Sequence, residues 1–178
     1  MNRRELETLL LTLESTPPLM ARAARGLPAS DARRRPAAGG FSLTENVWHL
    51  ADLEREGFGV RIRRILCEDE PTLSNFDGDR IARERSYQSR DVEAGLQAFS
   101  ESRRRNIETL RSLTAADWNR SGVQDGVGPL SLADLPRKMA EHDRSHTSDV
   151  AALLAELSST SAPRGTAPPT PHRVSAVA

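Results

Sequence analysis

Two histidines four residues apart, His142 and His146, are the residues whose type and spacing point most directly to chemistry. On a helix, side chains at this spacing project from the same face. Both fall on an apolar stripe, where two imidazoles need hydrogen-bond partners or a shared metal ion. Spacing alone leaves two interpretations open: a pair of metal ligands, or two core histidines that bond to neighbouring helices.

A third histidine, His49, lies in the helical segment N-V-W-H-L-A-D-L-E. Helical bundles build their sites from facing helices, so one histidine here and two on a later helix would form a three-nitrogen site. Three protein ligands leave positions open for water or substrate, the pattern of a catalytic metal. Asp52 and Glu56, which follow on a related face, are candidates for holding a ligand in place or relaying a proton. The alternative is that both carboxylates face solvent.

Other chemistries are less well supported by the sequence. The run H-D-R-S-H at 142–146 resembles the zinc-protease motif, but Asp143 stands where that motif needs its general-base glutamate. Cys67 is the only cysteine, so no intrachain disulfide forms. On a continuous helix it would lie roughly 27 Å from His49, too far to act as the nucleophile of this site.

The charge balance and the hydropathy of the chain limit the classes of partner that it can be expected to bind. Acidic and basic residues balance at 25 each, which removes the electrostatic argument for binding nucleic acid or an anionic membrane surface. No run of about 18 apolar residues predicts a transmembrane helix, and the N-terminus does not resemble a secretion signal. We therefore expect a cytoplasmic protein with no nucleic-acid or membrane partner.

The sequence predicts four helices that position the histidines. Apolar residues recur at helical spacing in four segments: 6–20, 42–67, about 90–113 and 131–157. Pro17 and Pro18 interrupt the first segment and predict a kink or a restart, with Thr16 as an N-cap. Pro136 either marks the first turn of the fourth helix or bends a helix that begins at Ser131.

The remaining segments are expected to connect these helices. Ser42 and Glu45 form a capping-box pattern at the start of the second helix. Residues 69–88 and 117–129 are rich in polar residues, glycine and proline, and are predicted to be loops, with no strand. The chain is therefore an all-α, single-domain protein over 1–157, and the Ser-, Pro- and Ala-rich segment 158–178 is predicted to be a disordered tail.

Several motifs together resemble those of the DinB-like superfamily, also called the YfiT-like metal-dependent hydrolases. The matching segments are 34–54, 117–118, 128–135 and 140–146. The resemblance covers about residues 3–157 and implies an up-down-down-up four-helix bundle, often dimeric. It also implies one divalent metal ion, commonly zinc, nickel or iron, held by His49, His142 and His146. Pro136 departs from the family pattern, in which the helix more often continues with a leucine-like residue.

The resemblance also implies a function. Better-understood relatives transfer or isomerise groups with a low-molecular-weight thiol such as mycothiol or bacillithiol. In such a reaction the metal favours the thiolate, which is the nucleophile. Hydrolysis by water activated on the ion is a variant. We therefore expect a metal-dependent transferase or hydrolase that acts on a small molecule as a homodimer. The alternative is a non-enzymatic metal-binding or stress-response module.

Overall fold

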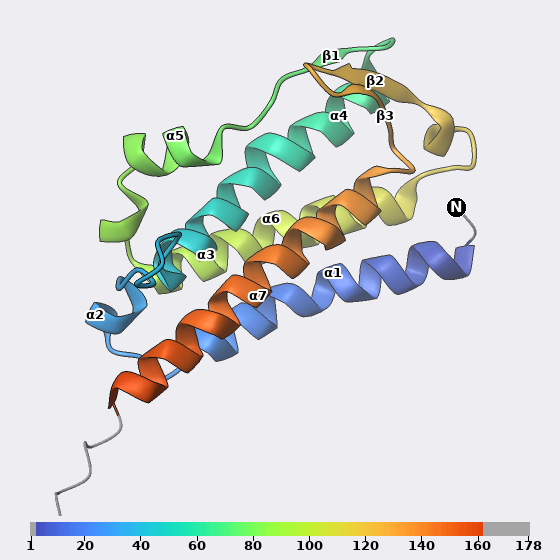
Figure 1. Cartoon of the computed structure of the whole chain (residues 1–178). Coiled ribbons are helices and arrows are strands. Elements are labelled where there is room, and N and C mark those ends of the chain that lie inside the picture. Colours follow the sequence, from blue (N-terminus) through green and yellow to red (C-terminus); the bar gives the residue numbers. More distant parts are fainter. Residues whose placement is uncertain (1–2, 162–178) are drawn as a thin grey trace, which may run out of the picture.

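The computed structural model describes residues 3–161, and four long helical segments dominate it (Figure 1). They are α1 (Arg3–Ala24), α3 with its continuation α4 (Leu43–Asp52 and Gly59–Cys67), α6 (Val92–Ser112) and α7 (Leu135–Ser161). A π-helical turn, Leu53–Phe58, joins α3 to α4. The short elements are α2 (Ala29–Ala32), α5 (Gly78–Glu84), 3-10 turns at Tyr87–Ser89 and Asp117–Asn119, and strands β1 (Thr72–Leu73), β2 (Ser121–Gln124) and β3 (Gly128–Ser131).

The long helices form the predicted up-down-down-up bundle. In Figure 1, α1 and α7 run in one direction, whereas α3–α4 and α6 run in the other. Helix α3 packs on α6 and α7, and α1 packs on the same two helices from the opposite side. Because α3–α4 and α6 are parallel, residues 68–91 must return along the length of the bundle. We call this connection the return segment; it carries α5 back over α3.

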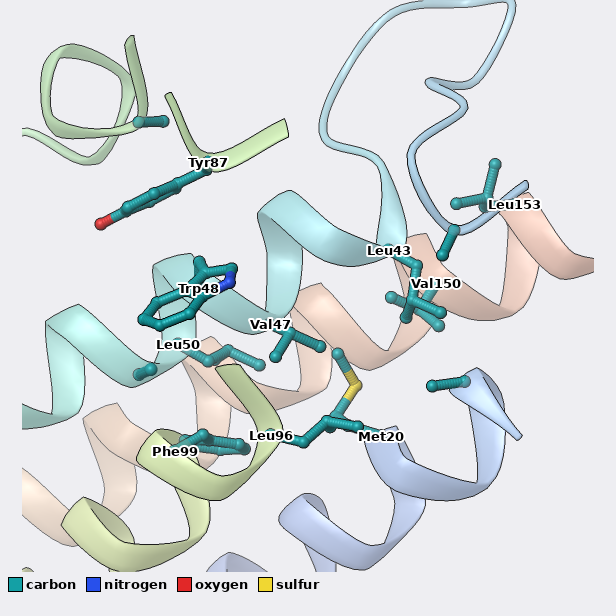
Figure 2. Close-up of a cluster of buried hydrophobic side chains, with 14 of the residues drawn as sticks. Met20, Leu43, Val47, Trp48, Leu50, Tyr87, Leu96, Phe99, Val150 and Leu153 are labelled. Carbon is teal, nitrogen blue, oxygen red and sulfur yellow. The ribbon is translucent and has the colours of Figure 1, made fainter. Parts of the chain in front are cut away.

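Helix α3 lies at the centre of the molecule, and every residue from Ser42 to Glu54 is buried. Its apolar side chains pack with those of α1, α6 and α7, as Figure 2 shows for Val47, Met20, Phe99 and Val150. The ring of Tyr87, from the return segment, covers this cluster and is fully buried. A helix enclosed on all sides must satisfy its polar side chains internally, which makes α3 the natural carrier of a buried polar site.

The predicted start of the second helix is confirmed. The Ser42 hydroxyl accepts from the backbone N–H of Glu45 at 3.2 Å, and the Ser42 backbone N–H donates to the Glu45 carboxylate at 2.9 Å. Arg35 forms an ion pair with the same carboxylate. These reciprocal bonds satisfy N–H groups that the first helical turn leaves unpaired.

The predicted restart of the helix at Pro17 and Pro18 is wrong, because α1 continues through both prolines. Thr16 is not an N-cap; its hydroxyl donates to the buried Asp143 at 2.6 Å. Pro17 has no N–H to offer the carbonyl of Leu13, four residues earlier. The Arg103 guanidinium donates to that carbonyl instead, at 2.9 Å. A bond from α6 thus replaces one that the helix itself cannot make.

Helix α7 begins later and ends later than predicted. It starts at Leu135, which confirms the first of the two alternatives for Pro136, a place in the first turn of the helix. Ser131 pairs in β3 and does not start the helix. At the other end, α7 continues through 158–161, past the predicted end of the bundle at 157. The Ser158 and Thr160 hydroxyls bond to backbone carbonyls of the preceding turn, at 2.8 Å each. The rest of the predicted tail, 162–178, lies outside the described residues.

The expectation of no strand is also wrong, since a small sheet closes one end of the bundle. Strand β1 pairs parallel to β2, and β2 pairs antiparallel to β3. Strands of two to four residues are too short to show an alternating pattern, and the pairing of 72–73 with 123–124 joins distant parts of the chain. Within residues 3–161, no helix is long and apolar enough to cross a membrane.

Candidate metal centre

The three histidines singled out from the sequence converge between α3 and α7. His49 projects from α3, and His142 and His146 project from successive turns of α7. The Nε2 atom of His142 lies 3.2 Å from the Nε2 of His49 and 3.2 Å from the Nε2 of His146. All three ligand atoms lie within 4.8 Å of one another, so the histidines could hold one metal ion.

The spacing of these nitrogens fits a first-row divalent ion. Imidazole nitrogens bind zinc at about 2.0–2.1 Å, which places two ligands of a tetrahedral site about 3.3 Å apart. The observed Nε2–Nε2 distances of 3.2 Å agree with that value. Two neutral imidazoles 3.2 Å apart can share at most one proton as a hydrogen bond, whereas an ion satisfies all three lone pairs at once.

Burial keeps the three imidazoles in the form that binds metal. Burial, together with His146 and His142, lowers the pKa of His49 to about 3. Burial, followed by His146, lowers the pKa of His142 to about 4. Burial also lowers the pKa of His146. At neutral pH all three rings are therefore uncharged, and each has a lone pair to offer.

Asn46 fixes the tautomer of His146. The Asn46 amide nitrogen donates to the backbone carbonyls of Phe41 and Ser42, at 3.1 and 3.0 Å. Its oxygen is therefore the atom that faces Nδ1 of His146, at 2.6 Å. An acceptor at Nδ1 keeps the proton there and leaves the Nε2 lone pair free for a metal. The sequence analysis missed Asn46, although its place three residues before His49, on the same helical face, is a signal that could have identified it.

Phenylalanine rings pack against the imidazoles of His49 and His142. Phe41 and Phe76 lie 5.5 and 5.8 Å from His49 between ring centroids, and Phe58 lies 6.1 Å from His142. Among the described residues, the buried Nδ1 atoms of His49 and His142 have no hydrogen-bond partner. Water is thus kept from the rear of the cluster, which strengthens electrostatic interactions inside it.

His146 lines a pocket of about 370 Å³ that has several charged residues in its wall. Its charged lining comes from α5 and α7 and from the chain before α3: Asp79, Arg83, Asp149 and Arg35. Asn46 also lines it. A pocket of this size can hold a small molecule. Of the three histidines, His146 is the one in its lining.

Asp52 and Glu56 bond to residues other than the histidines. Asp52 is fully buried and accepts from the Tyr87 hydroxyl at 2.5 Å and from Arg85 at 2.5 Å. Glu56 accepts from Arg85 at 2.8 Å and from Arg55 at 2.8 Å. Burial and the Asp52 carboxylate raise the pKa of Tyr87, which keeps its hydroxyl a donor. These bonds join the return segment to Asp52 and Glu56, at the end of α3 and in the π-helical turn. The hydrogen bonds of the two carboxylates among the described residues do not include a histidine.

Asp143, which lies between the two histidines of α7 in sequence, points into the bundle. Arg103 donates to both of its oxygens, at 2.6 and 2.8 Å, and also pairs with Glu54 at 2.9 Å. The ion pair with Arg103 therefore accounts for the buried Asp143 carboxylate, and no role as a protease base is needed to explain it. Cys67, exposed at the end of α4, lines a different groove and takes no part in the cluster.

Comparisons with known proteins agree with the fold and identify the family. A family model described as the DinB superfamily matches residues 12–150, a range that contains all three histidines. A Bacillus licheniformis protein named "putative metal-dependent hydrolase" is 28% identical over 127 residues, covering 71% of this chain and 72% of that protein. A Geobacillus kaustophilus protein of the same description is 27% identical over 150 residues, covering 84% of each.

A solved structure shares the whole bundle. YfiT from Bacillus subtilis, a four-helix bundle, superposes with a TM-score of 0.82 at 19% sequence identity. The match covers 89% of this chain and 90% of YfiT. At this level of identity the likeness establishes the common fold.

Proposed function

The chain belongs to the DinB superfamily, and from this premise we propose that it is a metal-dependent enzyme that acts on a small polar molecule. His49, His142 and His146 bind one divalent ion through Nε2. The observation that carries the proposal is the convergence of three uncharged imidazoles, with Nε2 of His142 3.2 Å from Nε2 of each of the other two, beside a pocket with charged residues in its lining. Three protein ligands leave further positions on the ion available, which a purely structural site would close.

The bound ion would supply a Lewis acid that acidifies a coordinated water or thiol. Three neutral ligands leave the full double charge of the ion in place, which favours an anionic partner at the remaining position. Two relatives carry the name "putative metal-dependent hydrolase", which supports water as the nucleophile and hydrolysis as the reaction. A low-molecular-weight thiol at the same position would give the transferase instead.

Residues around the histidines have different roles in the proposed site. Asn46 holds the proton of His146 at Nδ1, and the phenylalanine rings keep water from behind His49 and His142. Substrate reaches the site through the pocket beside His146. Asp79, Asp149 and Arg83 line that pocket and favour a polar or charged substrate over an apolar one.

Elemental analysis of protein purified without a chelating tag tests the metal. One equivalent of a divalent ion is expected in the wild type, and much less in His142→Ala. A well-folded wild type that takes up no zinc, nickel, cobalt or iron at micromolar concentration would rule the proposal out.

The cobalt-substituted protein separates the enzyme from a non-enzymatic module. Adding a small thiol, or raising the pH, should change its visible spectrum if the position is open. A new charge-transfer band with thiol would favour the transferase, and a response to pH alone would favour the hydrolase. If the spectrum responds to neither, the position is closed, and a metal-binding module replaces the enzyme.

A further inference from the structure

Gly78, the first residue of α5, lies directly against the ring of His49. A Cβ atom built on Gly78 would stand 2.6 Å from Nδ1 of His49, and closer still to Cε1. Contacts under 3.0 Å essentially do not occur for a real Cβ. No side chain larger than hydrogen fits between this backbone and the imidazole as they stand.

The backbone conformation does not explain this glycine. Gly78 is absent from the residues with positive φ, so an L-residue could adopt its conformation. Glycine is also a poor helix former, costing about 1 kcal/mol relative to alanine inside a helix. The close approach to His49 is therefore the feature of the structure that requires a glycine at this position.

The first turn of α5 cannot easily move away from the ring. Asp77 caps the helix by accepting from the backbone N–H of Arg80 at 3.0 Å. Ile81 and Ala82 are buried in the core cluster beneath α5. Phe76, just before the cap, packs edge-on against the same imidazole. The return segment therefore contacts the ring of His49 from both sides of the cap, through Phe76 before it and Gly78 after it.

We propose that Gly78 is a positioning residue of the metal centre. Its missing side chain lets α5 close on the rear edge of His49, and this contact keeps Nε2 aimed at His142 and His146. The inference rests on the proposed metal site. A methyl group at position 78 would displace the ring by on the order of 1 Å to restore van der Waals separation. Metal–nitrogen distances tolerate only about 0.2 Å, so the ligand would be lost or bound poorly.

The test compares Gly78→Ala with Gly95→Ala. A Cβ on Gly95 of α6 would stand 2.9 Å from both Trp48 and Val47, so this control crowds α3 from another side without touching a histidine. Cobalt affinity is measured by competition with a chelator, and the coordination geometry by the visible spectrum. We expect Gly78→Ala to bind cobalt at least tenfold more weakly and with an altered spectrum. Gly95→Ala should stay within about twofold of the wild type.

Equal cobalt affinity and spectra in the wild type and Gly78→Ala would overturn this inference and leave the proposed function intact. Failure of the wild type to bind any metal would overturn the proposed function. The part of the inference that would remain is that Gly78 positions the ring of His49, and the imidazole NMR resonances of His49 in the metal-free protein test that part. A shift in Gly78→Ala but not in Gly95→Ala would support it, and unchanged resonances in both would overturn it.

A double variant covers the case in which Gly78→Ala is unstable. If the methyl collides with the imidazole, any fall in melting temperature should disappear in the His49→Ala background, because the ring is gone. A fall that persists in the double variant would show that Gly78 serves the backbone and not His49.

Discussion

At the scale of single residues, the site depends on keeping three histidines uncharged and correctly protonated in the interior. His49 is 7% exposed, and its neighbours are two more imidazoles and phenylalanine rings. Sequence spacing could pair His142 with His146, because both lie on one helix. The place of Asn46 beside His49 marks it as a site residue, but spacing could not pair it with His146, since that contact spans 100 residues. Nor could spacing show that Asp52 bonds to Tyr87 and not to a histidine.

The role of Asn46 predicts a defect in metal binding. Asn46→Ala removes the acceptor at Nδ1 of His146, so the ring can rotate or change tautomer. We expect a ten- to hundredfold loss of affinity for zinc, the usual cost of removing such a partner. The control is Thr44→Val, which also removes a buried bond from α3 to the preceding chain, at 3.0 Å, but touches no histidine. Similar zinc affinities for both variants would contradict the assigned role.

The same burial predicts how the stability of the metal-free protein depends on pH. The pKa of His49 is about 3 in the folded chain, against about 6.5 when exposed. Between these values the unfolded chain binds more protons, so stability is full above pH 6.5 and falls as the pH drops. From pH 7 to pH 5, His49 alone should account for a loss of roughly 2 kcal/mol.

Urea unfolding of the metal-free protein at several pH values measures this loss. The variant His49→Gln should lose clearly less stability over the same pH interval, because it has no imidazole to protonate. A wild type and a variant with parallel pH profiles would show that His49 is not held neutral by burial.

At the scale of elements, the sequence predicted what local residues determine and missed what distant ones determine. The capping box of Ser42 and Glu45 is local, and the start of the second helix was predicted correctly. In α1, the carbonyl that Pro17 leaves without a helical partner is bonded by Arg103, which is far away in the sequence. The small sheet was missed for the same reason, since β1 pairs with residues about fifty positions later.

Arg103 joins the elements that carry the site. From α6 it bonds to the Leu13 carbonyl of α1, to Glu54 in the π-helical turn and to Asp143 of α7. Its guanidinium is 2% exposed, and so its charge is balanced almost entirely by these partners. Asp143 lies one residue after His142, so this network also sets the position of the metal-binding face of α7.

Removing the guanidinium should therefore be costly. We expect Arg103→Met to lower the free energy of unfolding by about 3–5 kcal/mol, because Glu54 and Asp143 would be left buried and unpaired. Arg105→Met, on the same helix, breaks an exposed pair with Glu101 and should cost less than about 1 kcal/mol. Denaturant unfolding of both variants checks the difference. Equal costs would mean that the buried network does not join the helices.

At the scale of the whole molecule, the up-down-down-up order explains why a long connection reaches the site. Two parallel neighbours, α3–α4 and α6, cannot be joined by a short turn, and the return segment crosses α3 on its way (Figure 1). It delivers Phe76 and Gly78 to His49, and Tyr87 to Asp52. A simple up-down-up-down bundle would have left this face of α3 without such a cover.

Assembly is a further prediction at this scale. We expect a homodimer, as the resemblance to the DinB-like superfamily implies. Light scattering at micromolar concentration should give twice the chain mass of 19.6 kDa. The mass of a single chain under these conditions would contradict a stable dimer, without affecting the histidine site.

The central claim is that one ion is held by His49, His142 and His146, and anomalous diffraction from crystals of the zinc-loaded protein tests it most directly. The account predicts a single strong peak between α3 and α7, about 2.0–2.1 Å from the three Nε2 atoms. Asn46 should remain on Nδ1 of His146, and a non-protein ligand should fill the remaining position. A zinc-loaded crystal with no peak among these histidines, or with zinc held only by surface carboxylates, would contradict it.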